Sequence, residues 1–372
     1  MADESESRAT GCRFPGCVCC SYIRFSLIFV FQAAKIGIQV RKLPGSLYFY
    51  PMLKNENSNQ PVLYLAPLQG FTDFVYRKVY SEVFSLIDAF FIPYISVKNH
   101  EVIKKYRKEI LPENNPQNRV IPQVLVADPE EMIFLTEYLA DFGYTEINLN
   151  LGCPYPMVTN RGMGAGLLPH PEKIKEILAA FFEKSSVKLS VKMRAGLVTP
   201  AEIEKIIPVL NQFPLTEVIL HPRIARQLYE GEIIESAFQF AYGNLQHRLV
   251  YNGDVNTVES IEKRMVKYPE TSHFMLGRGV LMNPFLPAKI KGIVFSKAEK
   301  REKLILFHKR MLEEYLSVMD NPGNALNKMR QFWNYFCHNF TEPKKSLKKI
   351  EKSGSFSAFQ IAVTTNFRDY LS

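Results

Sequence analysis

Short apolar runs rich in β-branched residues alternate along the chain with longer stretches in which apolar residues recur at helical spacing. The alternation begins at about Val62 and continues to about Pro287. The short runs predict eight strands, at residues 62–66, 88–92, 120–125, 145–149, 188–193, 216–220, 248–252 and 273–276. The stretches between them predict helices, among them 73–83, 129–141, 171–183, 200–211 and 256–265.

Strand and helix follow each other in repeated βα units, which is typical of a parallel sheet. Asp128-Pro129 and His170-Pro171 predict helix starts, because proline suits the first helical turn. Eight parallel strands buried on both faces favour a closed barrel over an open doubly wound sheet, which usually needs fewer strands and a switch in strand order. The predicted fold class is therefore α/β, a (β/α)8 TIM barrel followed by a small C-terminal helical domain.

The strand pattern stops beyond Pro287, where LILFHKRMLEEYLSVM and ALNKMRQFWNYFCHNF have the pattern of amphipathic helices. We expect the barrel to occupy residues 61–295 and the helical domain residues 296–372. Residues 1–60 precede the barrel as an N-terminal extension.

The N-terminal extension carries four of the six cysteines, followed by the apolar run FSLIFVF. A metal knuckle, a signal-like leader and a membrane anchor are three interpretations, and none fits well. Adjacent Cys19 and Cys20 with no nearby histidine do not suit a tetrahedral metal site, and the run is shorter than the roughly 20 residues that cross a bilayer. The alternative that residues 1–51 lie outside the native fold, with Met52 as the start, stays open.

Composition narrows the possible partners and the compartment. A chain of 372 residues that is 47% apolar can bury a large core, so disorder throughout is excluded. The net charge of +9 favours a polyanionic partner, although many basic proteins bind no nucleic acid. Only Cys153 and Cys337 lie outside the first twenty residues, so the folded part has no disulfide framework and we expect a cytoplasmic protein.

Polar and glycine residues gather where the predicted strands end. In a (β/α)8 barrel the active site is built at the C-terminal ends of the strands, so these positions are the candidate site. Following the chain, they are Ala66-Pro67-Leu68-Gln69-Gly70, Gln123, Asn150-Leu151-Gly152-Cys153-Pro154, Lys192, Arg194, His221, Asn252-Gly253-Asp254 and Gly277-Arg278-Gly279.

Two of these features indicate an anionic ligand. Glycines after the last two strands let backbone N–H groups approach a phosphate, although each motif alone also fits a plain strand-to-helix turn. Lys192 lies within a strand, and a lysine that points into a barrel mouth needs a partner or loses several kcal/mol of solvation. The partner is either an anionic ligand or a structural carboxylate.

Cys153 stands in a Gly-Cys-Pro turn after the fourth strand, which places its thiol at the barrel mouth. With an unperturbed pKa of about 8.5, a cysteine is mostly protonated at neutral pH and can act as an acid. A nucleophile, a metal ligand and an inert core residue are the competing interpretations.

Several separated motifs resemble those of the tRNA-dihydrouridine synthases, in order and at barrel-compatible spacing, from about Val62 to the C-terminus. LAPLQGFTDFVYR at 65–77 is similar to the family's opening flavin motif, INLNLGCP at 147–154 to its catalytic-loop motif, and GMGAGLL at 162–168 to the glycine-rich segment that follows. VKMRAG, YNGDV and MLGRGVLMNP complete the series.

The resemblance implies an FMN enzyme in which NADPH or NADH reduces the flavin. A hydride then passes from the flavin to C6 of a tRNA uridine while Cys153 protonates C5, which gives 5,6-dihydrouridine. The resemblance places Asn150, Arg194 and Arg223 near the substrate. It implies FMN contacts from Ala66, Pro67, Leu68, Gln123, Lys192, His221, Asn252, Gly253, Asp254, Gly277 and Arg278.

The sequence departs from the family pattern at three places. His221-Pro222-Arg223-Ile224 stands where the family usually has His-Gly-Arg-Thr, which bears on the local loop geometry and on the role of Arg223. Asn148 replaces a common aspartate, and Leu68 replaces a common methionine.

A uridine in folded RNA is usually stacked, so it must be flipped out, and phosphate contacts elsewhere must offset that cost. We expect a monomer that binds tRNA and neither a metal nor a membrane. The candidate phosphate contacts are basic clusters whose alternative interpretation is a solvated charged face: Lys344, Lys345, Lys348, Lys349 and Lys352, and Lys104, Lys105, Arg107 and Lys108.

Two rival functions remain open from the sequence. An FMN barrel that reduces a free pyrimidine would use the same hydride geometry, but the basic helical C-terminus argues against it. A non-catalytic RNA-binding barrel is the second rival, and the presence of Cys153 and Lys192 argues against that one.

Overall fold

The computed structural model describes residues 39–43, 46–50, 60–98, 101–117, 119–369 and 371. The chain divides into two compact units, Met1–Asn59 and Gln60–Ser372. In the first unit the described residues form an antiparallel pair of strands, β1 (Gln39–Leu43) and β2 (Ser46–Tyr50). The N-terminal cysteines, the apolar run and the possible start at Met52 lie outside the described residues.

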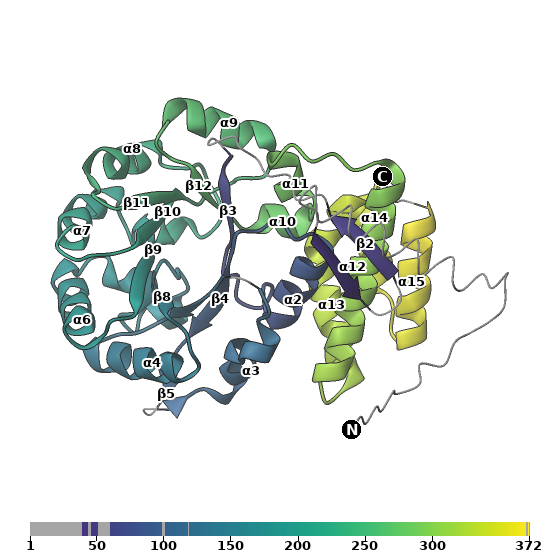
Figure 1. The fold of residues 1–372 in the computed structure, drawn as a ribbon, viewed down its shortest axis with the longest axis horizontal. Helices are drawn as coiled ribbons and strands as arrows, with labels where there is room; N and C mark the ends of the chain where they lie inside the picture. Colours follow the sequence, from purple (N-terminus) through teal and green to yellow (C-terminus); the bar gives the residue numbers. More distant parts are fainter. Residues whose placement is uncertain are drawn as a thin grey trace, which may run out of the picture. The chain divides into compact units, whose positions relative to one another are not determined.

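Eight parallel strands close into a barrel in the second unit, in the order β10-β11-β12-β3-β4-β7-β8-β9. The closed ring confirms the predicted (β/α)8 barrel and each of its predicted strands (Figure 1). The barrel strands are β3 (Val62–Leu65), β4 (Ala89–Ile95), β7 (Val120–Val124), β8 (Glu146–Leu151), β9 (Lys188–Gly196), β10 (Glu217–Ile224), β11 (Arg248–Tyr251) and β12 (His273–Leu276). A small antiparallel pair, β5 (Val97–Lys98) and β6 (Glu101–Val102), follows β4.

Helices connect the strands, and α4, α6, α7, α8 and α9 ring the barrel in Figure 1. Helix α4 begins at Pro129 with Asp128 as its cap, as predicted, and α6 begins at Pro171. The segment predicted as a helix over 200–211 begins instead as a 3-10 turn, η4 (Pro200–Glu202). The helices of the barrel are α2 (Phe74–Val83), α3 (Arg107–Ile110), α4 (Pro129–Asp141), α5 (Pro156–Thr159), α6 (Pro171–Lys184), α7 (Ile203–Leu210), α8 (Glu235–Asn244), α9 (Val258–Lys267), α10 (Arg278–Met282) and α11 (Leu286–Ile290). The other 3-10 turns of the barrel are η1 (Lys104–Tyr106), η2 (Pro112–Asn114), η3 (Gly164–Leu167) and η5 (Ala225–Gln227).

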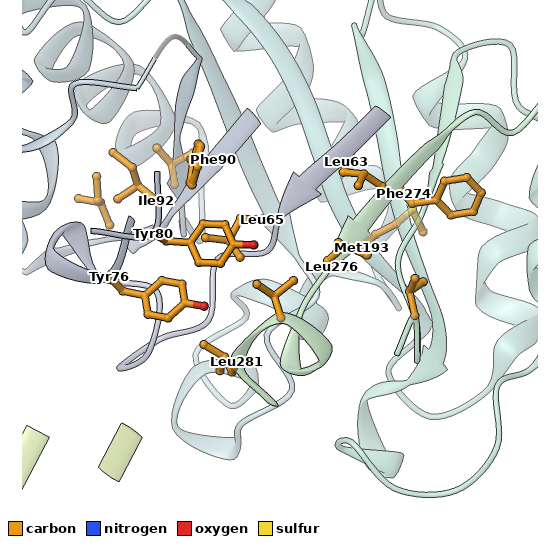
Figure 2. Close-up of a cluster of buried hydrophobic side chains, with 14 of the residues drawn as sticks. Leu63, Leu65, Tyr76, Tyr80, Phe90, Ile92, Met193, Phe274, Leu276 and Leu281 are labelled. Carbon is orange, nitrogen blue, oxygen red and sulfur yellow. The ribbon is translucent and has the colours of Figure 1, made fainter. Parts of the chain in front are cut away.

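Alternation along the strands creates two apolar layers, because successive side chains of a strand point to opposite faces. One set, with Leu65, Phe90 and Leu276, packs outward against helices such as α2, whose Tyr76 and Tyr80 join it (Figure 2). The other set fills the barrel itself: Tyr64, Ala66, Ala89, Phe91, Ile121, Ile219, Val250 and Met275. The next inward positions toward the strand ends are polar: Gln123, Asn150, Lys192, His221 and Asn252. The interior of the barrel therefore has an apolar layer, and the layer next to it, toward the C-terminal ends of the strands, is polar.

The chain after the barrel forms four helices and one 3-10 turn among the described residues. The Phe307 ring packs edge-on against Tyr76 of α2, with ring centroids 5.7 Å apart. It packs in the same way against Phe84, the C-cap residue of α2, at 5.3 Å. Tyr315 donates a hydrogen bond to the Asp73 carboxylate at 3.0 Å. A division into separate domains at residue 296 stays a prediction. The elements are α12 (Lys297–Val318), α13 (Pro322–Phe336), η6 (Cys337–Asn339), α14 (Pro343–Glu351) and α15 (Phe356–Asp369). In the part of the chain that the structure describes, no helix combines the length and apolarity that a membrane crossing requires.

Candidate active site

A pocket opens at the C-terminal ends of the barrel strands, and every one of the eight strands or the loop after it contributes to its lining. Its volume is about 870 Å³, counting space that is open to solvent. Fourteen of the predicted site residues line it: Ala66, Pro67, Leu68, Gln123, Asn150, Cys153, Lys192, Arg194, His221, Asn252, Gly253, Asp254, Gly277 and Arg278.

The charge of the lining is mainly positive. Lys192, Arg194 and Arg278 contribute three cations, and Asp254 is the carboxylate. Asp254 already pairs with Arg278 at 3.2 Å and with Arg223 at 2.5 Å. These contacts outweigh the burial of Asp254 and lower its pKa. The pocket is thus suited to an anionic ligand rather than a cationic one.

Lys192 has no carboxylate partner among the described residues, and neither does Arg194, which donates instead to the backbone carbonyls of Gly152 and Ile224. Burial, and next the neighbouring Arg194, lower the pKa of the Lys192 ammonium from 10.5 to about 7, while Cys153 raises it slightly. No carboxylate contributes to the shift, which removes the interpretation of a structural ion pair. A ligand with negative charge would restore the ordinary pKa of this lysine.

Arg223 is the predicted site residue that does not line the pocket. Its guanidinium donates to Asp254 and to the carbonyl of Gly231 at 2.6 Å, and it lies 3.2 Å from Nε2 of His221. Strand β10 continues through this segment to Ile224, with a register shift after His221, whereas the sequence predicted that the strand ends at 220. The donors of Arg223 are therefore already engaged by Asp254 and the carbonyl of Gly231. A contact between Arg223 and the substrate stays a prediction.

His221 is neutral in this setting. Burial lowers the pKa of its imidazole well below the usual value, and the cations around it lower it further. The ring can therefore accept or donate one hydrogen bond without adding charge. The surrounding cations are Arg194, Lys192, Arg223 and Arg278.

Three tyrosines in the lining were not predicted from the sequence: Tyr94, Tyr155 and Tyr229. The guanidinium carbons of Arg194 and Arg278 lie 5.3 and 5.2 Å from the centroid of the Tyr229 ring. Each tyrosine follows a barrel strand or ends one, so the rule that located the polar residues could also have found them. An aromatic residue next to a strand is more readily interpreted as core.

A chain of side-chain amides connects the barrel interior to the Cys153 turn. Asn148 donates to Ser190 Oγ at 2.9 Å and accepts from Gln123 Nε2 at 2.7 Å. Gln123 in turn accepts from Asn150 Nδ2 at 2.6 Å, and Asn150 Oδ1 accepts from the backbone N–H of Cys153 at 2.8 Å. Each amide has one orientation only. Asn148, fully buried, satisfies both ends of its amide where an aspartate would bury a charge.

The Cys153 side chain is 7% exposed at the rim of the pocket. Burial raises the pKa of its thiol, and a backbone N–H from Tyr155, the side chain of Tyr94, and the cations of Arg194 and Lys192 offset that effect in part. The thiol is therefore protonated at neutral pH, as a proton donor must be. Within the described residues, no group of three or more His, Cys, Asp or Glu side chains is arranged to hold a metal ion.

The glycine-rich segment after the turn packs directly on Cys153. Gly164 has φ +58°, and a Cβ added there would lie 3.0 Å from both the Cβ and the carbonyl oxygen of Cys153. The N–H of Ala165 donates to that carbonyl at 3.1 Å. Asn150 thus holds the backbone N–H of Cys153, and the segment GMGAGLL holds its carbonyl and packs on its Cβ.

Known proteins provide an independent comparison. The model of the family described as dihydrouridine synthase (Dus) matches residues 64–368. The tRNA-dihydrouridine synthase B of Pasteurella multocida is 26% identical over 228 residues, 60% of this chain and 67% of that protein. The tRNA-dihydrouridine(16) synthase of Cupriavidus necator is 26% identical over 264 residues, 69% of this chain and 81% of that protein.

Among solved structures, the old yellow enzyme from Trypanosoma cruzi aligns with 69% of this chain and 92% of its own, with a TM-score of 0.46 and 8% identity. That likeness is too low to carry an argument about function. The family match, in contrast, runs from the first barrel strand to the last helix, over well more than half of the chain. The chain belongs to the dihydrouridine synthase family.

Proposed function

We propose that this protein is a tRNA-dihydrouridine synthase, which reduces the C5=C6 bond of specific uridines in tRNA to 5,6-dihydrouridine with FMN and NADPH or NADH. The observation that carries the proposal is the pairing, in one pocket of a family barrel, of the unpartnered cation of Lys192 with the protonated thiol of Cys153. Relatives of this chain bear the name tRNA-dihydrouridine synthase. A cytoplasmic location and a monomeric state stay predictions.

The lining residues fit FMN in charge. A Cβ at Gly277 would find its first neighbours, the side chains of Ala66 and Leu68, at 3.9 and 4.0 Å, so the backbone after β12 is not crowded, and Arg278 beside it supplies a cation for a phosphate. Lys192 supplies the cation that stabilises negative charge on a reduced flavin ring. When bound, the reduced flavin supplies the hydride that adds to C6. The proposed site also includes Ala66, Pro67, Leu68, Gln123, His221, Asn252, Gly253 and Asp254.

The chain itself supplies the proton and holds its donor. Cys153 gives its thiol proton to C5 of the uracil, and the Asn150 amide fixes the turn that carries the thiol. We assign Asn150 and Arg194, which line the pocket, to contacts with the base, while Arg223 holds Asp254 from behind the lining. Because Arg194 also donates to the carbonyls of Gly152 and Ile224, it links the Cys153 turn to β10.

Flipping a uridine out of the RNA stack costs a few kcal/mol, which phosphate contacts elsewhere can offset. Helix α14 presents exposed lysines for this purpose, among them Lys344 and Lys348. The second predicted cluster, near α3, includes exposed Lys104 and Arg107, while the side chain of Lys105 lies outside the described residues. We assign both clusters to tRNA phosphates.

The test of the proposal is the substitution Cys153→Ala. We expect the variant to bind FMN and to let NADPH bleach the flavin as fast as the wild type does, because the thiol touches neither step. Dihydrouridine formed in tRNA, measured by mass spectrometry of nucleosides, should fall by about 100-fold or more, the contribution that a positioned acid typically makes. Wild-type tRNA reduction by the variant would remove Cys153 from the acid role.

A further inference from the structure

Tyr94 of β4 is directed into the pocket by an irregularity in its strand. Regular alternation after Phe91, which points into the barrel, would turn position 94 outward toward the helices. The register between β4 and β7 shifts between Ile92 and Ile95, and Pro93 lies within the shift. As a result Tyr94 lines the pocket, while Ile95 packs into the outer core. Such bulges next to active sites commonly redirect a side chain.

The redirected tyrosine meets Cys153. Tyr94 packs against the small cluster that Cys153 forms with Leu125, Val158 and Met163. Both side chains line the same pocket, and the tyrosine hydroxyl and the thiol each act on the pKa of the other. Burial, followed by the adjacent Cys153, raises the pKa of the Tyr94 hydroxyl above its usual value. The hydroxyl therefore keeps its proton at neutral pH and can donate it in a hydrogen bond to sulfur.

We propose that Tyr94 is a positioning residue for the proton donor, whose hydroxyl holds the Cys153 sulfur at the pocket rim and stabilises the thiolate left after proton transfer. The inference rests on the proposed function. In each turnover the S–H bond breaks, its proton and the hydride from the reduced flavin form the new C–H bonds at C5 and C6, and NADPH or NADH is oxidised. The thiolate then takes a proton from water through the Tyr94 hydroxyl.

Other groups near the two side chains must stay constant in a test. The groups that act on the Cys153 thiol are the Tyr155 backbone N–H, Tyr94, Arg194 and Lys192, and Tyr229 also interacts with it. The groups that act on Tyr94 are Cys153, Tyr106 and Tyr155. Removal of the Tyr94 hydroxyl leaves all the cations in place, so a change in the thiol pKa reports on that hydroxyl.

Tyr155 offers a matched control. Its side chain is 45% exposed and lines the same pocket, but it reaches the thiol through its backbone N–H. The substitution Tyr155→Phe therefore removes a neighbouring phenol hydroxyl and keeps the hydrogen bond to sulfur. Tyr94→Phe removes the hydroxyl that contacts the sulfur and keeps the ring that fills the cluster.

The experiment measures the thiol pKa in the full-length protein. Alkylation of Cys153 by iodoacetamide, followed by mass spectrometry of its peptide across a pH series, reports the thiolate fraction without interference from the other five cysteines. Loss of one hydrogen bond to the thiolate should raise the pKa by about one unit, which slows alkylation about tenfold below that pKa. Tyr155→Phe should follow the wild-type profile.

Dihydrouridine formation provides the second readout. We expect Tyr94→Phe to lower kcat with tRNA and to leave KM unchanged, since the hydroxyl acts on the thiol and not on RNA binding. Tyr94→Leu should give the same alkylation shift if the hydroxyl, rather than the ring, sets the thiol pKa. Equal alkylation profiles for the wild type and Tyr94→Phe, or an equal shift in Tyr155→Phe, would overturn the inference. Failure of the wild type to reduce tRNA would overturn the proposed function and leave the alkylation result standing.

Discussion

Lys192→Met should change stability and cofactor affinity in opposite directions. The lysine stands among inward-facing residues of β9 with no carboxylate partner among the described residues, so its charge is poorly solvated in the protein without ligand. Methionine has a similar length and carries no charge. We expect the flavin-free variant to be more stable than the wild type near neutral pH and to bind FMN much more weakly.

The magnitude follows from the pKa of the buried ammonium. A pKa lowered from 10.5 to about 7 corresponds, at about 1.4 kcal/mol per unit, to an upper limit of about 5 kcal/mol. Lys192 is partly exposed to the open pocket, so solvent screens its charge and we expect roughly 1–3 kcal/mol. Between pH 7 and 10.5 the unfolded chain binds this proton and the folded chain releases it, so wild-type stability should rise with pH in that window.

The assay is urea unfolding of flavin-free wild type and Lys192→Met at pH 7 and pH 9, beside FMN titration by fluorescence. The stability gain of the variant should be largest at pH 7 and shrink at pH 9, because the wild-type lysine is by then mostly neutral. FMN affinity of the wild type should fall as pH rises above 7, and that of the variant should be low at both pH values. A variant that is less stable than the wild type at pH 7 and binds FMN equally well would refute the reasoning.

Three further predictions concern the frame around the site. Burial lowers the pKa of His308 to about 3, so between pH 6.5 and 4.5 this histidine takes up a proton in the unfolded chain but not in the folded one. When the pH falls across that range, the wild type should therefore lose roughly 2 kcal/mol more unfolding free energy than His308→Gln, measured by urea unfolding. Equal losses would contradict the lowered pKa. Gly164→Ala, which crowds Cys153, should lower the rate of tRNA reduction by about 10- to 100-fold, whereas Gly162→Ala, with a similar φ of +68° and open space around it, should lower it far less. Deletion of residues 296–372 should give insoluble protein rather than an active barrel, because it uncovers the aromatic face of α2; a soluble barrel that binds FMN would show that the helices are dispensable.

The strands and most helix starts could be predicted from the sequence because buried positions are apolar and recur with the spacing of each element. Each barrel strand is buried on both faces, so it stands out as a short apolar run, and Pro129 and Pro171 mark helix starts through local chemistry alone. The ends of strands were less predictable. Strand β4 was predicted to end at residue 92, yet the chain continues through Pro93 to Ile95 by shifting register.

The pocket lining was predictable to the extent that it consists of polar residues at strand ends. Tyr94 was missed because an aromatic residue in a strand pattern is more readily interpreted as core, and the register shift that turns it inward depends on the pairing of β4 with β7. The amide chain from Ser190 to Asn150 depends on the register between three strands, which pairs Gln123 with Asn148 and Asn148 with Ser190. The engagement of Arg223 with Asp254 depends likewise on the end of β10 and the loop after β11, which meet only in the folded barrel.

The most direct test of the central claim is the dihydrouridine content of tRNA that lacks this modification, after incubation with the purified protein, FMN and NADPH. We predict that specific uridines gain two hydrogens while NADPH is consumed in equal amount. We also predict that free uracil is left unchanged. A protein that binds FMN and oxidises NADPH but leaves every uridine of every tRNA intact would contradict it.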